Sequence, residues 1–440
     1  MSKPQQSNDG EQMGKSLTDD KGRPVVVVTG FGVITSLGRG KNENWKALTS
    51  GQSGLHHITR FPTDGLRTTV AGTVDFMGLE TYSAPALSTA MASDAIVEAL
   101  CQSRIGDRAS FPGPLYLATP PTELEWPQRK ALFASPDEES REDGYKQLLK
   151  AARSGRFKDV FDKFQFASVA ETLAEEFGTQ GLPISLSTAC ASGATAIMLG
   201  VEAIRRGDTD AALCVATDGS VHAEALIRFS LLSALSTQND PPHKASRPFA
   251  KDRGGFVMAE GAGAFVLESY EAATARGAQI LGVVRGCGER ADEFHRTRTH
   301  PEGKPIIGAI QAALDDAGVA PGEIDYVNAH GTGTQENDKM EYLSLKAVLG
   351  DRIERVPISS NKSMIGHTLT AAGAIEAAFS LMSIHDETLP PTINYDLPDP
   401  DIPLDVVPNR SRRALVTNVL SNSFGFGGQN ASLVLSGEPA

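Results

Sequence analysis

The chain has 440 residues, of which 40% are hydrophobic and 43 are glycine, a composition that excludes a coiled coil, a collagen and a wholly disordered protein. Its formal net charge is −13, so its overall field repels nucleic acid and anionic lipid, and we expect neither as a partner. The four cysteines, Cys101, Cys190, Cys214 and Cys287, lie far apart without C-x-x-C spacing, so we expect no disulfide framework and no metal site.

The first residues form a polar extension. Residues 1–23 contain no apolar run typical of a signal peptide, and no segment approaches the about 18 apolar residues of a membrane span. We therefore expect a disordered N-terminal extension over residues 1–23, and a soluble, cytoplasmic protein without membrane insertion.

Strands and helices alternate after this extension. Residues 25–28 are predicted to form a buried strand that ends in a tight turn at 29–32. Apolar runs predict further strands at 113–118, 183–187, 211–216, 265–267 and 279–287, with a helix at 191–206. The same order returns after about residue 300, with helices at 306–317, 339–349 and 371–385 and strands at 324–329, 356–358 and 431–435. The alternation predicts an α/β fold, and its recurrence predicts two similar halves, residues 24–290 and 291–440.

Residues 120–166 interrupt this alternation. The segment is long and charged, with an acidic run at 137–143, and it contains Trp126. We expect an inserted helical segment whose charges form a solvated face, with a cap that shapes the site for a substrate or partner as the alternative.

Cys190 is the sharpest local signal for chemistry. The strand predicted at 183–187 is followed at once by Thr188, Ala189 and Cys190, and then by small residues that begin a helix. This order predicts a sharp strand-to-helix turn, where free N–H groups and the positive helix end favour the thiolate. Cys190 is therefore a candidate nucleophile, and an inert packed cysteine is the alternative.

Two histidines next to glycines are candidate partners of this thiol. His330 follows a predicted strand and precedes Gly331, and His367 follows Gly366 shortly before a predicted helix. Small neighbours let a ligand approach the imidazole rings closely, which packing alone would not require.

A third glycine-rich cluster, residues 422–430, contains Phe424 and Phe426. It lacks the lysine of a phosphate-binding loop, and Gly30 and Gly32 do not fit the dinucleotide-binding spacing, so we expect no nucleotide cofactor. A flexible loop with two aromatic side chains suggests a gate or an apolar wall.

These motifs together resemble the elongating β-ketoacyl-[acyl-carrier-protein] synthases, the type II ketosynthases of the thiolase-like superfamily. The resemblance spans residues 24–435, and its motifs occur in the family's order at 188–190, 330–334, 361–367 and 423–428. It implies an α/β thiolase-like fold with two similar α/β halves in a five-layered α-β-α-β-α arrangement, usually as a homodimer.

The resemblance also implies a catalytic set. Cys190 would take the acyl chain as a thioester, while His330 and His367 would assist decarboxylation of the malonyl group and stabilise the enolate oxygen. Lys362 belongs to the same set, and it matches with Glu376 a buried ion pair of the family.

Further residues match supporting and substrate-binding positions of the family. Asp338 matches a structural acid, and the hydroxyls of Thr332 and Thr334 match those that hold the pantetheine arm. Phe426, with Phe424 near it, would gate the acyl pocket, and the N–H groups of Cys190 and Phe426 would form the oxyanion hole.

The implied reaction is a decarboxylative Claisen condensation of the acyl chain on Cys190 with malonyl-acyl carrier protein, giving a 3-oxoacyl-carrier in fatty acid elongation. The acyl carrier protein is the implied partner, and no cofactor is expected because the carrier brings the phosphopantetheine.

A polyketide-type ketosynthase and a non-condensing chain-length partner subunit are the alternatives, although the latter would be expected to lack Cys190. An unrelated Cys–His hydrolase and a pure binding module are also weighed. A starter-type enzyme is disfavoured by His367, and a degradative thiolase by the lack of a second cysteine near the C-terminus.

The chain departs from the family pattern in two loops. Ala250 and Gly254 stand where the family usually has aspartate, which puts the local hydrogen bonding in question. Arg290, Arg296 and Arg298 make residues 289–300 unusually basic, which suggests carrier contact or loop gating.

Overall fold

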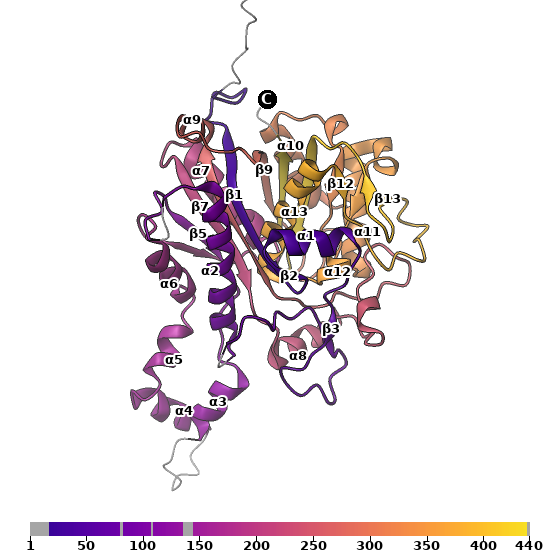
Figure 1. Cartoon of the computed structure of the whole chain (residues 1–440). Helices are drawn as coiled ribbons and strands as arrows, with labels where there is room; N and C mark the ends of the chain where they lie inside the picture. The colour runs from indigo at the N-terminus through magenta and orange to yellow at the C-terminus, as the bar shows by residue number, and fades with distance from the viewer. Residues whose placement is uncertain (1–16, 80–81, 107–108, 135–143, 438–440) are drawn as a thin grey trace, which may run out of the picture.

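One large mixed sheet runs through the protein (Figure 1). The structure, a computed structural model, describes residues 17–79, 82–106, 109–134 and 144–437. Within these ranges the sheet has twelve strands, eleven of them in the order β13 (Asp405–Val406), β11 (Pro357–Ser359), β10 (Tyr326–Asn328), β15 (Asn418–Phe424), β16 (Gln429–Ser436), β9 (Gly282–Ala291), β1 (Val26–Thr35), β8 (Gly261–Ser269), β7 (Ala211–Asp218), β5 (Leu115–Ala118) and β6 (Ile184–Leu186), with β2 (Gly38–Arg39) paired to β1.

Helices cover this sheet in layers. The helices α7 (Ser192–Arg205) and α13 (Ala372–Asp386) pack against each other, and α13 contacts both β8 and β15. On outer faces, α2 (Ala84–Ser103) packs on β1 and β8, while α10 (Lys304–Ala317) packs on β9 and β16 and also contacts α11 (Gln335–Leu349). α13 is buried through most of its length and is mainly apolar, as expected of a central helix, with Glu376 as a buried charged exception. The predicted five-layered α/β arrangement is confirmed.

The strands β1 and β9 join the two parts of the sheet. Val27 and Val28 of β1 pair antiparallel with Val283 and Gly282 of β9. β9 also pairs with β16 along most of its length. The boundary between halves at residue 290 stays a prediction, and it falls within the strand that connects the two parts.

The predicted turn at residues 29–32 is wrong. β1 continues to Thr35, with a register shift between Val28 and Gly30 in its pairing with β8. A Cβ atom on Gly30 would lie 2.1 Å from the carbonyl oxygen of Ala99 in α2, and one on Gly32 would lie 2.1 Å from that of Ala95. The glycines therefore serve close helix-on-sheet packing rather than a turn.

The segment 120–166 is helical where it is described. It contains α3 (Trp126–Phe133), α4 (Gly144–Arg153) and α5 (Lys158–Lys163), which lie below the sheet in Figure 1, and α6 (Ser168–Phe177) follows and packs on α2. The acidic run at 137–143 lies outside the described residues. Trp126 and Phe161 are exposed.

Residues 17–23 belong to the extension for which disorder is predicted, and the structure places them against the body of the protein. Arg23 Nη1 lies 2.7 Å from Asp316 Oδ1, and Arg23 also pairs with Asp19. The prediction for residues 1–16 lies outside the described residues.

Short elements complete the chain, and they include α8 (Ala223–Leu231) beside the candidate site. The others are α1 (Lys41–Thr49), β3 (His56–His57), β4 (Val70–Ala71), α9 (Tyr270–Ala275), α12 (Lys362–Ile365), β12 (Thr388–Leu389) and β14 (Arg412–Arg413). Among the helices of the described ranges, none combines the length and the apolar character needed to cross a bilayer.

Candidate active site

Cys190 lies in a tight turn between β6 and α7, as predicted. Ala189 has a φ of 50°, in the left-handed region that few side chains adopt. Ser192, at the start of α7, holds this turn: its Oγ accepts from the Thr188 N–H at 2.8 Å and donates to the Ala189 carbonyl at 2.5 Å. The turn thus directs the nucleophile candidate to the N-terminal end of a central helix.

Burial of the Cys190 thiol opposes the thiolate that the end of the helix is expected to favour. Burial raises the pKa of Cys190 to about 11, although the charge of Lys362 and the N–H of Phe426, which donates to the sulfur, both act to lower it. Only 8% of the residue is exposed, so the loss of water around a thiolate outweighs both favourable groups.

The structure brings the three main predicted residues together. The sulfur of Cys190 and a ring nitrogen each of His330 and His367 lie within 4.8 Å of one another, and all three side chains are buried. The two imidazole rings meet edge to face, with centroids 5.3 Å apart. A thiol and two imidazoles are also donors that zinc accepts, so an ion could bind here.

Burial favours the uncharged form of both imidazoles. Burial lowers the pKa of His330 and that of His367 well below the ordinary value, and the positive charge of Lys362 acts in the same direction. The N–H of Leu369 donates to His367 Nδ1 at 3.3 Å, so the neutral ring carries its own proton on Nε2. His330 Nδ1 is buried without a hydrogen-bond partner among the described residues, which leaves a ring nitrogen available to a substrate.

Lys362 and Glu376 form a buried ion pair beside these rings. Lys362 comes from α12 and Glu376 from α13, each side chain is 1% exposed, and Lys362 Nζ donates to Glu376 Oε1. Burial raises the pKa of Glu376 to about 7, and the ammonium of Lys362 opposes that shift. The pair therefore places a positive charge close to the thiol and both imidazoles.

Glu341 is a supporting residue that the sequence analysis missed. Its carboxylate accepts from the N–H groups of His330 at 2.9 Å and Gly331 at 2.7 Å, and it is fully buried. Burial raises the pKa of Glu341 to about 7, and the two N–H groups oppose that shift. In the structure Asp338, Glu341 and Leu345 share one face of α11 and all three are buried, which the charged sequence of this helix does not reveal.

Asp338 ties the loop after His330 to a neighbouring loop. Its carboxylate accepts from the N–H groups of Phe249 at 2.7 Å and Gly333 at 3.1 Å. The loop that carries Ala250 and Gly254 keeps acidic contacts all the same, since Arg253 Nη1 lies 2.6 Å from Asp399 Oδ2 and Arg253 Nε lies 3.7 Å from Asp338.

The hydroxyls of Thr332 and Thr334 lie 2.9 Å apart on the wall of the cavity. Thr334 is also the N-cap of α11, where its oxygen accepts from the Asn337 N–H at 3.2 Å. Loss of this hydroxyl would therefore affect the helix as well as any ligand.

The glycine-rich loop lies directly on the Cys190 turn. A Cβ atom on Gly425 would lie 3.1 Å from Cys190 N and 2.9 Å from the Thr188 carbonyl oxygen, so this contact needs a glycine. Phe424 is buried against the His330 ring, with centroids 5.6 Å apart. Phe426 is half-buried on the cavity wall.

The basic loop at 289–300 is bonded to this glycine-rich loop. Gly427 N–H donates to the Arg296 carbonyl at 2.8 Å, and Asp292 N–H donates to that of Gly428 at 2.7 Å. Arg296 and Arg298 line the cavity and are exposed, whereas Arg290 does not line it.

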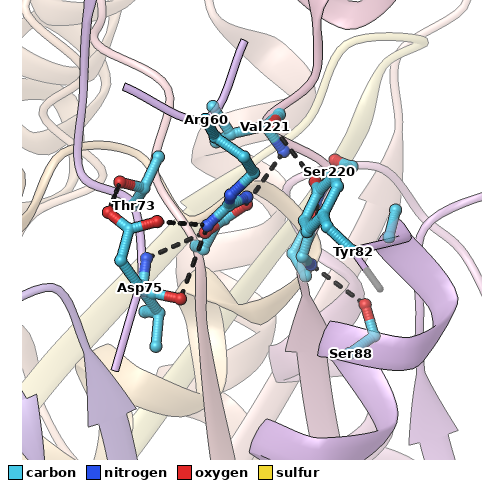
Figure 2. Close-up of polar contacts among 12 residues, drawn as sticks. Arg60, Thr73, Asp75, Tyr82, Ser88, Ser220 and Val221 are labelled. Atoms are coloured by element: carbon cyan, nitrogen blue, oxygen red, sulfur yellow. Dashed lines mark hydrogen bonds and ion pairs between the residues drawn. The ribbon is translucent and has the colours of Figure 1, made fainter. Parts of the chain in front are cut away.

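A polar network supports the segment after β7 (Figure 2). The Arg60 guanidinium lies 2.6 and 2.9 Å from the oxygens of the buried Glu260 and 2.8 Å from Asp75 Oδ1, and it stacks over the ring of Tyr82. Tyr82 donates its hydroxyl to the carbonyls of Gly219 at 2.7 Å and Val221 at 3.1 Å. The network thus fixes the backbone of residues 219–221.

Asp218 links this segment to the histidine loop. Its carboxylate accepts from the hydroxyl of Thr370 at 2.8 Å and from the Thr370 N–H at 3.2 Å. Since Thr370 follows shortly after His367, the network and Asp218 together hold the turn on which this imidazole sits.

A cavity of about 500 Å³ opens beside the three reacting groups. Its lining contains hydroxyl, amide and charged side chains as well as aromatic and aliphatic ones. The polar group includes Thr332, Thr334, Asn337 and Asn430, and the apolar group includes Phe229, Leu232, Phe256, Leu369, Phe424 and Phe426. Such a cavity suits a ligand with one polar and one apolar portion.

Comparisons with known proteins agree with this geometry. Family models for the N-terminal and C-terminal domains of beta-ketoacyl synthases match residues 133–273 and 281–396. The chain is 37% identical over 424 residues to the tetracenomycin polyketide synthase ketoacyl synthase alpha subunit of Streptomyces glaucescens, covering 93% of this chain and 96% of that protein. It is 36% identical over 420 residues to 3-oxoacyl-[acyl-carrier-protein] synthase 2 of Coxiella burnetii, covering 93% and 98%. Among solved structures, one similar chain comes from a complex of a type II polyketide synthase acyl-carrier protein with its ketosynthase bound to the hexaketide. The two chains superimpose with a TM-score of 0.83 and are 31% identical in sequence, and the match covers 94% of this chain and all of that one.

Proposed function

Since this chain belongs to the β-ketoacyl synthase family, an acyltransferase family, we propose that it condenses an acyl thioester on Cys190 with malonyl-acyl carrier protein and releases carbon dioxide. The product is a 3-oxoacyl-acyl carrier protein, as in fatty acid elongation. The observation that carries this proposal is the meeting of one thiol and two buried imidazoles within 4.8 Å on the wall of a cavity.

In the first step Cys190 takes the acyl chain. Its sulfur attacks the carbonyl of the carrier thioester, the carbon–sulfur bond to the carrier breaks, and the released carrier sulfur takes the thiol proton. The N–H of Phe426, which donates to the sulfur of Cys190 in the free protein, and the N–H of Cys190 supply hydrogen bonds to the carbonyl oxygen as it becomes negative. The charge of Lys362 assists removal of the thiol proton.

In the second step the malonyl group loses carbon dioxide and leaves an enolate. The Nε2–H of His367 is available to donate a hydrogen bond to the enolate oxygen. His330 has a ring nitrogen without another partner among the described residues, and this nitrogen is available to the same oxygen. Neutral imidazoles suit stabilisation of the enolate because each can donate a hydrogen bond to the oxygen, while its N–H proton is not acidic enough to protonate the carbanion. The carbanion then attacks the thioester carbon, the bond to Cys190 breaks, and the departing thiolate takes up a proton from water.

The same proposal names partners and a location. An acyl carrier protein brings both thioesters, its pantetheine arm lies against Thr332 and Thr334, and these steps need no cofactor of the enzyme. We also propose a cytoplasmic homodimer. Its support is β6, an edge strand of the sheet, beside which Leu182 is 91% exposed and on which Ile184 is 46% exposed.

Intact-protein mass spectrometry tests the function. Wild-type protein is incubated with acyl-carrier proteins, and malonyl-carrier is then added while carbon dioxide is measured. We expect an acyl adduct that malonyl-carrier discharges, absent from Cys190→Ala and unchanged in the matched control Cys101→Ala. An adduct that water alone discharges would instead identify a thioester hydrolase, and Cys190→Ala with full activity would contradict the proposal.

A polyketide-type condensation is the second candidate. The match to the Streptomyces glaucescens polyketide subunit favours it, because its identity is as high as that to the Coxiella burnetii enzyme. A non-condensing partner subunit is disfavoured by the intact set of Cys190, His330 and His367.

A further inference from the structure

The apolar wall of the cavity leads from the reacting groups to α8. The ring of Phe256 lies 5.3 Å from that of His367, and the ring of Phe229 lies 5.4 Å from that of Phe256. Phe229 also faces Phe426, at 6.5 Å. An acyl chain bound to Cys190 would contact these aromatic side chains, which connect His367 with α8 along the cavity.

Charged side chains on and near α8 also line the cavity. Ala225, Arg228 and Leu232 lie at helical spacing on one face of α8 and its C-cap, and all three line the cavity. Arg228 Nη2 donates to Glu123 Oε1, and both residues line the cavity. Since Arg228 directly precedes Phe229 in α8, the ion pair adjoins the aromatic side chains.

The pair retains hydrogen-bonding capacity. The Arg228 side chain is 56% exposed, and Glu123 is its hydrogen-bond partner among the described residues, so its remaining N–H groups are open to water. Glu123 has other neighbours as well, with Arg129 Nη2 and His222 Nε2 each 4.0 Å from its carboxylate. Glu123 is therefore held in place, while the guanidinium remains able to donate.

An alkyl chain and an oxygenated chain would meet this pair differently. Methylene groups placed against Arg228 and Glu123 remove water and return no hydrogen bond, which is unfavourable. A carbonyl or hydroxyl oxygen at the same place accepts from the guanidinium, and hydrogen bonds to charged groups are among the stronger ones in proteins.

We propose that Arg228, positioned by Glu123, makes this cavity select acyl chains that carry a carbonyl or hydroxyl oxygen on carbons beyond the thioester. The inference rests on the proposed function, because it concerns the chain that Cys190 accepts. It assigns a specificity-determining residue and the class of chain that it prefers.

The test compares thioesters of equal length. Octanoyl-pantetheine and its derivatives with one oxo group at C3, C5 or C7 are offered separately, and the rate of Cys190 acylation is measured by intact mass. At least one oxo chain should load about tenfold faster than octanoyl, the scale of one hydrogen bond to a charged group. Arg228→Leu with Glu123→Leu should remove this preference, whereas Arg206→Leu with Asp208→Leu, an exposed ion pair away from the cavity, should keep it.

Each outcome bears on the inference separately from the function. Loading of Cys190 with equal rates for all four chains would overturn the selection by Arg228 and leave the proposed function standing. A preference that survives in the double leucine variant would also overturn it. No loading by any thioester or acyl-carrier would refute the proposed function, and the inference with it.

Discussion

At Cys190, burial and nearby positive charge act on the thiol in opposite directions, and burial prevails. With a pKa of about 11, the thiolate fraction should increase about tenfold for each pH unit through pH 9 and 10. The rate of alkylation by iodoacetamide, followed by mass at Cys190 with Cys190→Ala as the blank, should therefore still be rising above pH 9. A plateau below pH 8 would show that the helix end and Lys362 outweigh burial.

The two histidines should separate the half-reactions. His330→Ala or His367→Ala should slow carbon dioxide release by about 10²-fold, the usual loss for one oxyanion donor, while acylation of Cys190 continues. The two steps are measured separately, by labelled malonyl-carrier and by intact mass. His243→Ala, a change at an exposed histidine, is the matched control. Release of carbon dioxide at the wild-type rate in both variants would contradict the assigned roles.

Residues with distinctive local sequence were predictable, and residues defined by distant contacts were not. Cys190, His330 and His367 could be found because small residues surround each of them at the end of a predicted strand. Glu341 looks like one charge among many on α11, and only its contact with the His330 backbone shows its use. The pairing of Glu123 with Arg228 joins residues 105 positions apart and leaves no local pattern.

At the scale of elements, the contact of β1 with α2 depends on two glycines. Gly32→Ala should lower the free energy of unfolding by about 1–3 kcal/mol or more, because the new methyl group meets the backbone oxygen of Ala95. Urea unfolding measures the change. Gly254→Ala is the control, because nothing lies within 4 Å of its added Cβ atom. Equal stability of the two variants would mean that α2 can move away from the strand at little cost.

The order of strands and helices could be predicted from hydrophobic periodicity, whereas the end of one strand, the role of its glycines and one polar strand could not. The apolar run at 25–28 identified β1, but its continuation through Gly30 and Gly32 depends on contacts with Ala99 and Ala95 of α2, which lie more than 60 residues later. β15 was not predicted, since its polar residues Asn418, Ser421, Asn422 and Ser423 hide a buried strand. Their hydrogen-bond partners lie on other elements, including Ser432 and Ser436 on β16.

At the scale of the whole molecule, Arg60 connects parts of the chain that are distant in sequence. Arg60→Met would leave the fully buried Glu260 without its cation, and we expect a loss of about 3–5 kcal/mol in the free energy of unfolding. Arg206→Met, which breaks an exposed pair, should cost less than about 1 kcal/mol. Chemical denaturation compares them, and a loss below about 1 kcal/mol for Arg60→Met would show that Glu260 is neutral or finds another partner.

The position of β1 in the sheet has a consequence for how the chain is made. β1 is the first long strand to be synthesised, yet both of its long neighbours, β8 and β9, lie between residues 261 and 291. During synthesis on the ribosome, β1 therefore cannot pair with these neighbours until more than half of the chain has emerged. During that interval the nascent chain presents an unpaired apolar strand, so this protein's yield in cells should depend on chaperones that bind such strands during translation.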